Sequence, residues 1–321
     1  MSVNANAART NWLVFIALGF FWGSSYLFIK IGVDNGLTPF TLVTLRLLVG
    51  TILLGGVILA SREKLPRDPR MYAKIAILAL FAIALPFVLI TIAEQHTPSA
   101  LAATLTAPVP LFTVLFAAPM LGDRITAAKL AGVVIGLLGV AVLMGFDPSQ
   151  IGQTDLTYQL VLVAAAVSYG FGAAFARKYV VGLRPMVPAF IEVASAFVMV
   201  AICAFLFESP LSLVGTLPAD AIFAVLWLGF FGSGLAYLAF FRLIGAWGAT
   251  RTSMVAYLLP IWGIFLGFIV LNEPIQQGLV LGTALIIGGI AFVNTDRESL
   301  ATVATKVRAA VSRSAPSAAE R

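Results

Sequence analysis

The segment PLFTVLFAAPMLGDRITAAKLAGVVIGLLGVA (residues 110–141) recurs in altered form 150 positions later as PIWGIFLGFIVLNEPIQQGLVLGTALIIGGIA (residues 260–291). Each copy is a pair of apolar runs joined by a short turn that carries one carboxylate. The aligned pairs are Pro110 with Pro260, Asp123 with Glu273, Ile125 with Ile275, Gly132 with Gly282, Gly139 with Gly289 and Ala141 with Ala291. An internal match of this length predicts that the two halves of the chain fold alike.

A weaker match extends the repeat toward the start of each half. Trp22-Gly23 resembles Tyr169-Gly170 at an offset of 147, and Pro39 aligns with Pro188 at an offset of 149. We therefore expect a first repeat at residues 1–150, a second at residues 151–296 and a basic tail at residues 297–321.

The composition places both halves in a membrane. Hydrophobic residues make up 60% of the 321 residues and charged residues 11%, against roughly 45–50% and 25% in soluble domains. The mean hydropathy of +1.02 agrees. The residues outside the apolar segments are too few for a soluble catalytic domain or a nucleic-acid module. The net charge of +6 therefore does not predict nucleic-acid binding.

Ten apolar runs are long enough to be helices across a bilayer, which needs about 20 residues. Strands are excluded because each run is about twice the roughly 10 residues of a barrel strand and lacks alternation. The first run is too long for a signal-peptide core, so we interpret it as a retained span. The expected fold is an all-α polytopic membrane protein with spans near residues 11–29, 39–60, 75–93, 99–121, 130–146, 156–176, 188–207, 221–241, 252–271 and 277–293.

The positive charges predict the orientation. All of the 20 Lys and Arg residues except Lys30 and Arg46 fall on one side of the predicted spans, and basic residues stay on the cytoplasmic side. We therefore expect the protein to lie in the inner membrane with both termini in the cytoplasm. Five spans per repeat make the second half enter the membrane in the opposite direction, a pattern typical of secondary transporters.

Several passages, in this order and spacing, resemble the ten-span drug/metabolite transporter superfamily, specifically its EamA family. They are FWGSS (21–25) with Lys30, Arg46, TPSALAA (97–103) before PVP (108–110), YLAFFR (237–242), GATR (248–251), YLLP (257–260) and LNEP (271–274). Asp123 departs from the glutamate usual there but keeps the carboxylate.

The resemblance implies a carrier in which spans 1–4 and 6–9 surround a central cavity while spans 5 and 10 pack outside. Relatives of this kind move small organic metabolites and often export amino acids and related compounds. We therefore expect export of such a compound by alternating access.

Arg46 is the most informative single residue because a guanidinium inside a span is costly, about 2.5–3.5 kcal/mol at midplane, and needs a partner. Two interpretations are open. Arg46 could bind a substrate carboxylate in a bidentate manner, or it could hold its span to a neighbour through Asp34, Glu94 or backbone carbonyls.

Aromatic and small polar residues are the other candidates for a substrate cavity, because such cavities are mostly apolar with a few directed polar groups. An aromatic residue in a span is more often packing or interface, so we expect only some of these to contact substrate. The candidates are Trp22, Ser24, Ser25, Tyr26, Tyr169, Phe171, Tyr237, Tyr257 and Trp262.

Three titratable residues are proton-coupling candidates. Glu192 is the acid well inside an apolar run, and carboxyl groups in apolar surroundings often carry such a role. It could instead pair with Arg184 or snorkel. Glu94 and His96 end the third span. His96 is the single histidine, so it predicts no multi-histidine metal site, and a lone histidine at a loop edge is more often solvated than functional.

Four prolines are expected to kink or gate three of the spans, because proline removes a donor and clashes with the preceding turn. They are Pro86, Pro108, Pro110 and Pro260, of which Pro110 and Pro260 match across the repeat. Plain packing is the alternative.

Other function classes fit less well. A membrane enzyme would need a catalytic constellation that the intramembrane residues do not offer. There is no phosphate-binding Gly-x-x-x-x-Gly-Lys-Ser/Thr motif, and we expect no cofactor and no metal. A multidrug or lipophilic-cation exporter and a channel-like facilitator remain alternatives. The expected partners are a small-molecule substrate, lipid and protons, with the chain a monomer or weak homodimer.

Overall fold

The computed structural model describes residues 2–123, 125–145, 156–213, 215–247, 252–275 and 277–294, with side chains from Arg9 onward. The expected tail at residues 297–321 and the boundary between the halves lie outside these residues. Throughout the described part the chain is helical or connecting, without strands. This confirms the all-α fold.

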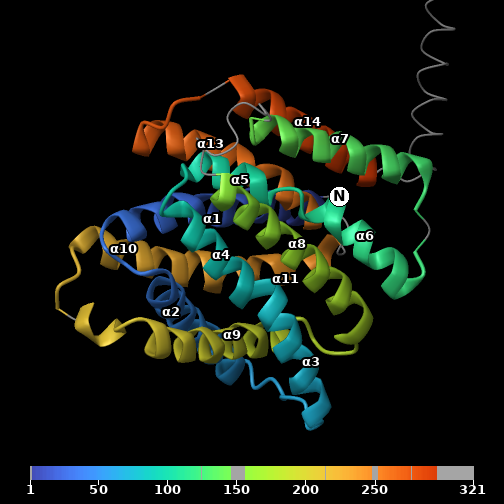
Figure 1. Cartoon of the computed structure of the whole chain (residues 1–321). Helices are drawn as coiled ribbons and strands as arrows, with labels where there is room; N and C mark the ends of the chain where they lie inside the picture. Colours follow the sequence, from blue (N-terminus) through green and yellow to red (C-terminus); the bar gives the residue numbers. More distant parts are fainter. Residues whose placement is uncertain are drawn as a thin grey trace, which may run out of the picture.

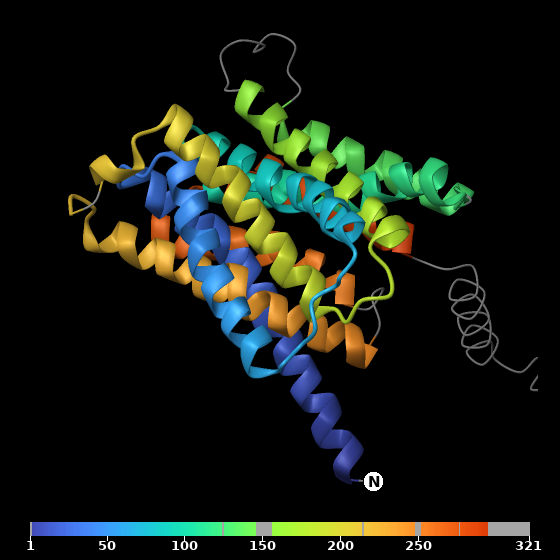
Figure 2. The same cartoon turned by 90° about the horizontal axis from the view of Figure 1, so that it is seen from below.

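Eight helical rods in the described residues are long and apolar enough to cross a membrane, and two shorter apolar helices, α7 (Ala127–Leu143) and the membrane part of α14 (Gln277–Asn294), complete the expected ten. The uninterrupted long rods are α1 (Ser2–Asp34), α2 (Pro39–Ala60), α8 (Leu156–Tyr179) and α9 (Met186–Phe207). Figure 2 shows the first turns of α1 projecting beyond the other helices. The helices are longer than the apolar runs because their ends extend into the polar boundary of the membrane.

Four rods are interrupted. The third consists of α3 (Pro69–Ala79), the π-helical η1 (Leu80–Ala84) and α4 (Leu85–Glu94), and the eighth of α10 (Ala219–Trp227), the π-helical η4 (Leu228–Leu235) and α11 (Ala236–Trp247). The fourth is split into α5 (Ser99–Thr106) and α6 (Val109–Leu121), and the ninth into the 3₁₀ segment η5 (Met254–Tyr257) and α13 (Leu258–Leu271). A short 3₁₀ turn, η3 (Pro210–Leu213), follows α9.

The interruptions fall close to the candidate prolines. Pro86 occupies the first turn of α4 directly after η1, and Pro108 stands between α5 and α6 with Pro110 in the next turn. Pro260 lies in the first turn of α13. In these first-turn positions a missing backbone donor costs little. The fourth and ninth rods are therefore interrupted at equivalent places, and so are the third and eighth, although the eighth has no proline there.

The helices pack in pairs that join the two halves. α2 lies along α9, α1 along α13, and α6 along α8. α7 and α14 lie side by side at one edge of the bundle (Figure 1) and contact each other far more than they contact the remaining helices. α7 and α14, the last rods of the two halves, thus pack outside the other eight rods.

Two carboxylates fix helix starts at one end of the bundle. The Glu208 side chain, just after α9, accepts hydrogen bonds from the backbone N–H groups of Phe40 (3.0 Å) and Thr41 (2.8 Å) at the start of α2. Glu273, just after α13, accepts from the N–H groups of Ser99 (2.7 Å) and Ala100 (2.9 Å) at the start of α5. Each carboxylate satisfies unpaired donors and complements the positive end of a helix dipole.

Glycines allow α7 and α14 to approach closely. A Cβ atom on Gly289 would lie 2.5 Å from the carbonyl oxygen of Gly132, and one on Gly139 would lie 2.8 Å from the carbonyl oxygen of Gly282. Neither position has room for a methyl group. Small residues of this kind let helices gain van der Waals contact inside lipid.

We expect Gly289→Ala to destabilise the protein by about 1–3 kcal/mol, because the added methyl group must push α14 away from α7. Gly288→Ala is the matched control, since a Cβ there meets nothing within 4 Å. Thermal unfolding in detergent measures both. Equal melting temperatures for the two variants would contradict the close approach.

Candidate functional site

Arg46 lies at the centre of the candidate site. It sits two turns into α2 and its residue exposure is 2%. Its Nε donates a hydrogen bond to Oγ of Ser233 in η4 at 3.2 Å, and its Cζ lies 4.2 Å from the ring centroid of Phe87 on α4. Three rods therefore meet at one guanidinium.

No carboxylate in the described part of the chain forms an ion pair with Arg46. The ion pairs found there join Lys30 to Asp34, Arg177 to Asp123 and Arg184 to Glu63. Asp34 is thus taken by Lys30, and Arg184 pairs with Glu63 rather than with Glu192. The guanidinium of Arg46 is held by one neutral hydroxyl and one aromatic face, which leaves most of its five N–H donors available.

Three tyrosines lie within electrostatic range of this guanidinium: Tyr26 on α1, Tyr169 on α8 and Tyr237 on α11. The hydroxyl of Tyr26 is hydrogen-bonded to Oγ1 of Thr106 at 2.6 Å, which ties α1 to the end of α5. The hydroxyl of Ser25 and the guanidinium of Arg46 both lie against Gly232, where a Cβ would come within 2.9 Å of the former and 3.2 Å of the latter. The tyrosines, Ser25 and Arg46 come from both halves of the chain.

Two buried acids lie at the edges of this cluster. Glu94, the last residue of α4, has 0% exposure, and neither carboxylate oxygen has a hydrogen-bond partner among the described residues. It lies within electrostatic range of Arg46 and Tyr26. Glu192 on α9 has 9% exposure and lies within range of Tyr169 and Tyr237.

The remaining sequence candidates lie in aromatic contacts. Trp22 packs on Phe240 of α11, with ring centroids 5.3 Å apart, and Trp262 packs on Phe20 at 5.1 Å. Phe171 packs on Phe81 at 4.6 Å. Tyr257, partly buried at the end of η5, packs against the core.

His96 is exposed and stacks on Tyr158 with ring centroids 3.9 Å apart. This position at a helix end agrees with its interpretation as a solvated loop residue. Its role in proton coupling stays a prediction.

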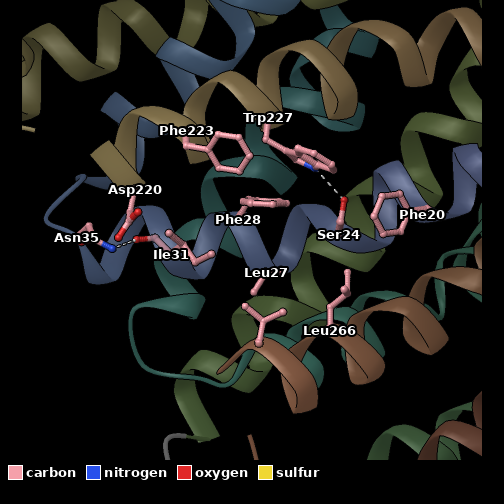
Figure 3. Close-up of a pocket in the computed structure, with 11 residues that line it drawn as sticks. Phe20, Ser24, Leu27, Phe28, Ile31, Asn35, Asp220, Phe223, Trp227 and Leu266 are labelled. Atoms are coloured by element: carbon pink, nitrogen blue, oxygen red, sulfur yellow. Dashed lines mark hydrogen bonds between the residues drawn. The ribbon is translucent and has the colours of Figure 1, made fainter. Parts of the chain in front are cut away.

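A groove of about 550 Å³ opens on another face of α1 (Figure 3). Apolar side chains of α1, α10 and α13 line it, together with the polar Ser24, Asn35 and Asp220. Trp227 Nε1 donates a hydrogen bond to Ser24 Oγ at 3.0 Å. Ser24 therefore faces this groove, whereas its neighbours Ser25 and Tyr26 face Arg46 and Thr106.

The side chains of residues 22–26 thus lie in different surroundings, because consecutive residues of an α-helix are rotated by about 100° around its axis. Sequence reasoning missed Ser233, Phe87 and Trp227. Their positions in the chain are far from Arg46 and Ser24, and no local pattern marks them.

Known proteins are similar to this chain in sequence and in fold. The model of the EamA-like transporter family matches residues 10–145 and again residues 156–295. The chain belongs to the EamA-like transporter family. Family membership indicates a transporter rather than an enzyme.

Relatives cover nearly the whole chain. An uncharacterized transporter of Archaeoglobus fulgidus is 28% identical over 88% of this chain and 98% of the relative. The uncharacterized inner membrane transporter YedA of Escherichia coli K12 is 28% identical over 86% of this chain and 88% of its own. A probable terminal-alkyne amino-acid exporter of Streptantibioticus cattleyicolor is 27% identical over 85% and 89%. A solved structure, titled "Crystal structure of protein", has the same fold, with a TM-score of 0.61 at 24% identity over 88% of this chain and 97% of that one.

We expect Tyr26→Phe to lower the stability of this transporter by about 0.5–1.5 kcal/mol, because it removes the buried hydrogen bond to Thr106. Tyr72→Phe serves as the control, since Tyr72 is exposed. Chemical denaturation in detergent compares the two variants. A loss in Tyr72→Phe as large as in Tyr26→Phe would contradict this role for the hydroxyl.

Proposed function

We propose that this member of the family is a secondary transporter that exports small carboxylate-bearing metabolites, amino acids or related compounds, by alternating access. The carrying observation is Arg46, a buried guanidinium without a carboxylate partner among the described residues. Charged groups inside membrane proteins are usually paired or mark a substrate path. A substrate carboxylate would supply the missing pair in a bidentate geometry that arginine favours.

Two further facts support an amino-acid-like substrate and its export. The relative from Streptantibioticus cattleyicolor is named a probable terminal-alkyne amino-acid exporter. Aromatic side chains from several rods lie close to Arg46, namely Phe87, Tyr26, Tyr169 and Tyr237, and such groups accommodate the apolar part of an organic ligand. A lipophilic cation is disfavoured because Arg46 would repel it.

Alternating access would follow from two inverted repeats of five spans. The family model matches the chain twice in succession, and the interruptions of the third and fourth rods recur in the eighth and ninth. Inverted repeats of secondary transporters place the substrate at their interface, and the groups around Arg46 come from both halves. We further propose an inner-membrane location with both termini in the cytoplasm, supported by the basic side of the chain and by the name of YedA.

The first test is counterflow into proteoliposomes preloaded with unlabelled amino acids. We expect saturable, preload-stimulated uptake of at least one labelled amino acid by the wild-type protein. Arg46→Gln should weaken its apparent affinity about 10–100-fold, because a hydrogen bond to a charged group contributes about 1.5–3 kcal/mol.

Thermal unfolding of the same preparations separates lost binding from lost folding. A folded Arg46→Gln variant with unchanged affinity would contradict carboxylate binding by Arg46. Uptake that neither saturates nor responds to preloading would favour channel-like facilitation instead.

Proton exchange is the coupling that we propose, with Glu192 as the carrier. Its carboxyl group is buried and has no basic partner among the described residues, and an amide in its place cannot carry a proton. We expect an imposed pH gradient to stimulate transport by the wild-type protein and to lose this effect in Glu192→Gln. Glu63→Gln is the control because this carboxylate lies in the connection after α2, where it pairs with Arg184. A pH response in Glu192→Gln equal to that of the wild type would contradict the assignment.

A further inference from the structure

The side chain of Glu94 is the least satisfied charged group in the described part of the chain. Its residue exposure is 0%, and both carboxylate oxygens lack any hydrogen-bond partner there. A buried carboxylate without a partner is costly, so such a group calls for a counter-charge, a proton or a ligand. The position is fixed, since Glu94 ends α4 and its backbone oxygen accepts a hydrogen bond from Lys30 Nζ at 3.1 Å.

The neighbouring charges do not neutralise the Glu94 carboxylate. The Lys30 ammonium group binds Asp34 at 2.8 Å and the backbone of Glu94, and it forms no ion pair with the Glu94 side chain. Glu273, the other carboxylate in range, is occupied by the first N–H groups of α5 and carries the same charge. The described residues therefore leave the Glu94 oxygens without a hydrogen-bond partner.

Arg46 is the buried opposite charge within electrostatic range of Glu94. Glu94 and Arg46 lie within electrostatic range of each other and of Tyr26, yet they form no ion pair within 4.0 Å. Two buried opposite charges would ordinarily close onto each other. Here both lie within electrostatic range of Tyr26 and neither has a charged partner among the described residues, which is the arrangement that a dipolar molecule bound to both would complete.

We propose that Arg46 and Glu94 bind the two ends of a zwitterionic substrate, with the carboxylate on Arg46 and the ammonium group on Glu94. The proposal rests on the proposed function and narrows its substrate class to molecules that carry both a free amino group and a carboxylate. Three ammonium hydrogens match the two unpartnered oxygens of Glu94, and the fork of Arg46 matches a carboxylate. An analogue that lacks either charged end leaves one buried group unpaired, and it is rejected for that reason.

The experiment is competition against counterflow of the amino acid that the wild-type protein transports best. The competitors are that amino acid, its 2-hydroxy acid, its N-acetyl derivative and the amine that lacks the carboxylate. We expect the wild-type protein to prefer the amino acid over each of the other three by at least about tenfold, since tenfold corresponds to about 1.4 kcal/mol.

Variants assign each end of the substrate. Glu94→Gln should bring the ratio between amino acid and 2-hydroxy acid close to one, whereas Arg46→Gln should do so for the ratio between amino acid and amine. Glu63→Gln is the control because it alters a carboxylate in the connection after α2, where it pairs with Arg184. It should keep the preference for the amino acid over the hydroxy acid.

Three results would overturn the proposal. The wild-type protein alone suffices for the first, which is equal competition by the amino acid and its hydroxy acid. The second is an unchanged ratio in a folded Glu94→Gln variant, including the case in which this variant loses only its response to a pH gradient. The third is the absence of saturable uptake of any amino or hydroxy acid by the wild-type protein, which also removes the proposed function. Uptake of both kinds alike leaves the proposed function standing and removes only the zwitterion site.

Discussion

The absence of water from the membrane interior is the constraint on which this structure depends. Every backbone donor and acceptor there must be paired within the protein, so the spans are helices and irregular backbone is tolerated only where protein covers it. The exceptions are informative. Ser233 lies within the π-helical η4, and Phe87 comes shortly after the π-helical η1. The side chains of Ser233 and Phe87, which contact Arg46, thus come from the two rods that contain a π-helical segment, and such segments are frequent at functional sites.

The charged groups of the described residues fall into two classes, those that have partners and those that are buried without a charged partner. Glu208 and Glu273 satisfy the first N–H groups of α2 and α5, and each ion pair of the described residues includes at least one exposed group. Arg46, inside its span, and Glu94, at the end of α4, are instead buried without charged partners among the described residues. Burial of an unpaired charge costs free energy. A bound substrate that pairs with Arg46 and Glu94 would remove this cost.

The sequence predicted the helices well because length and hydropathy are local properties. Their ends differ by a few residues, as where the third rod begins at Pro69 rather than near residue 75, because helix continues past the apolar run. Arg46 could be found because a guanidinium is rare inside a span. The FWGSS motif was harder to interpret, since Trp22 packs on Phe240, Ser24 faces the groove beside Trp227, and Ser25 faces Arg46. Adjacent helical residues point in different directions, and only their neighbours decide their surroundings.

The sequence by itself determined that the chain is a bundle of membrane helices, that prolines stand inside three of the apolar runs, and that one arginine lies within a span, because hydropathy, proline and charge act locally. Only the tertiary structure decided what surrounds that arginine. Ser233 is 187 residues from Arg46, and Thr106 is 80 residues from Tyr26. The unpartnered state of Glu94 is also a property of the packed helices, because whether a buried charge has a partner depends on side chains that the chain brings together only when it folds.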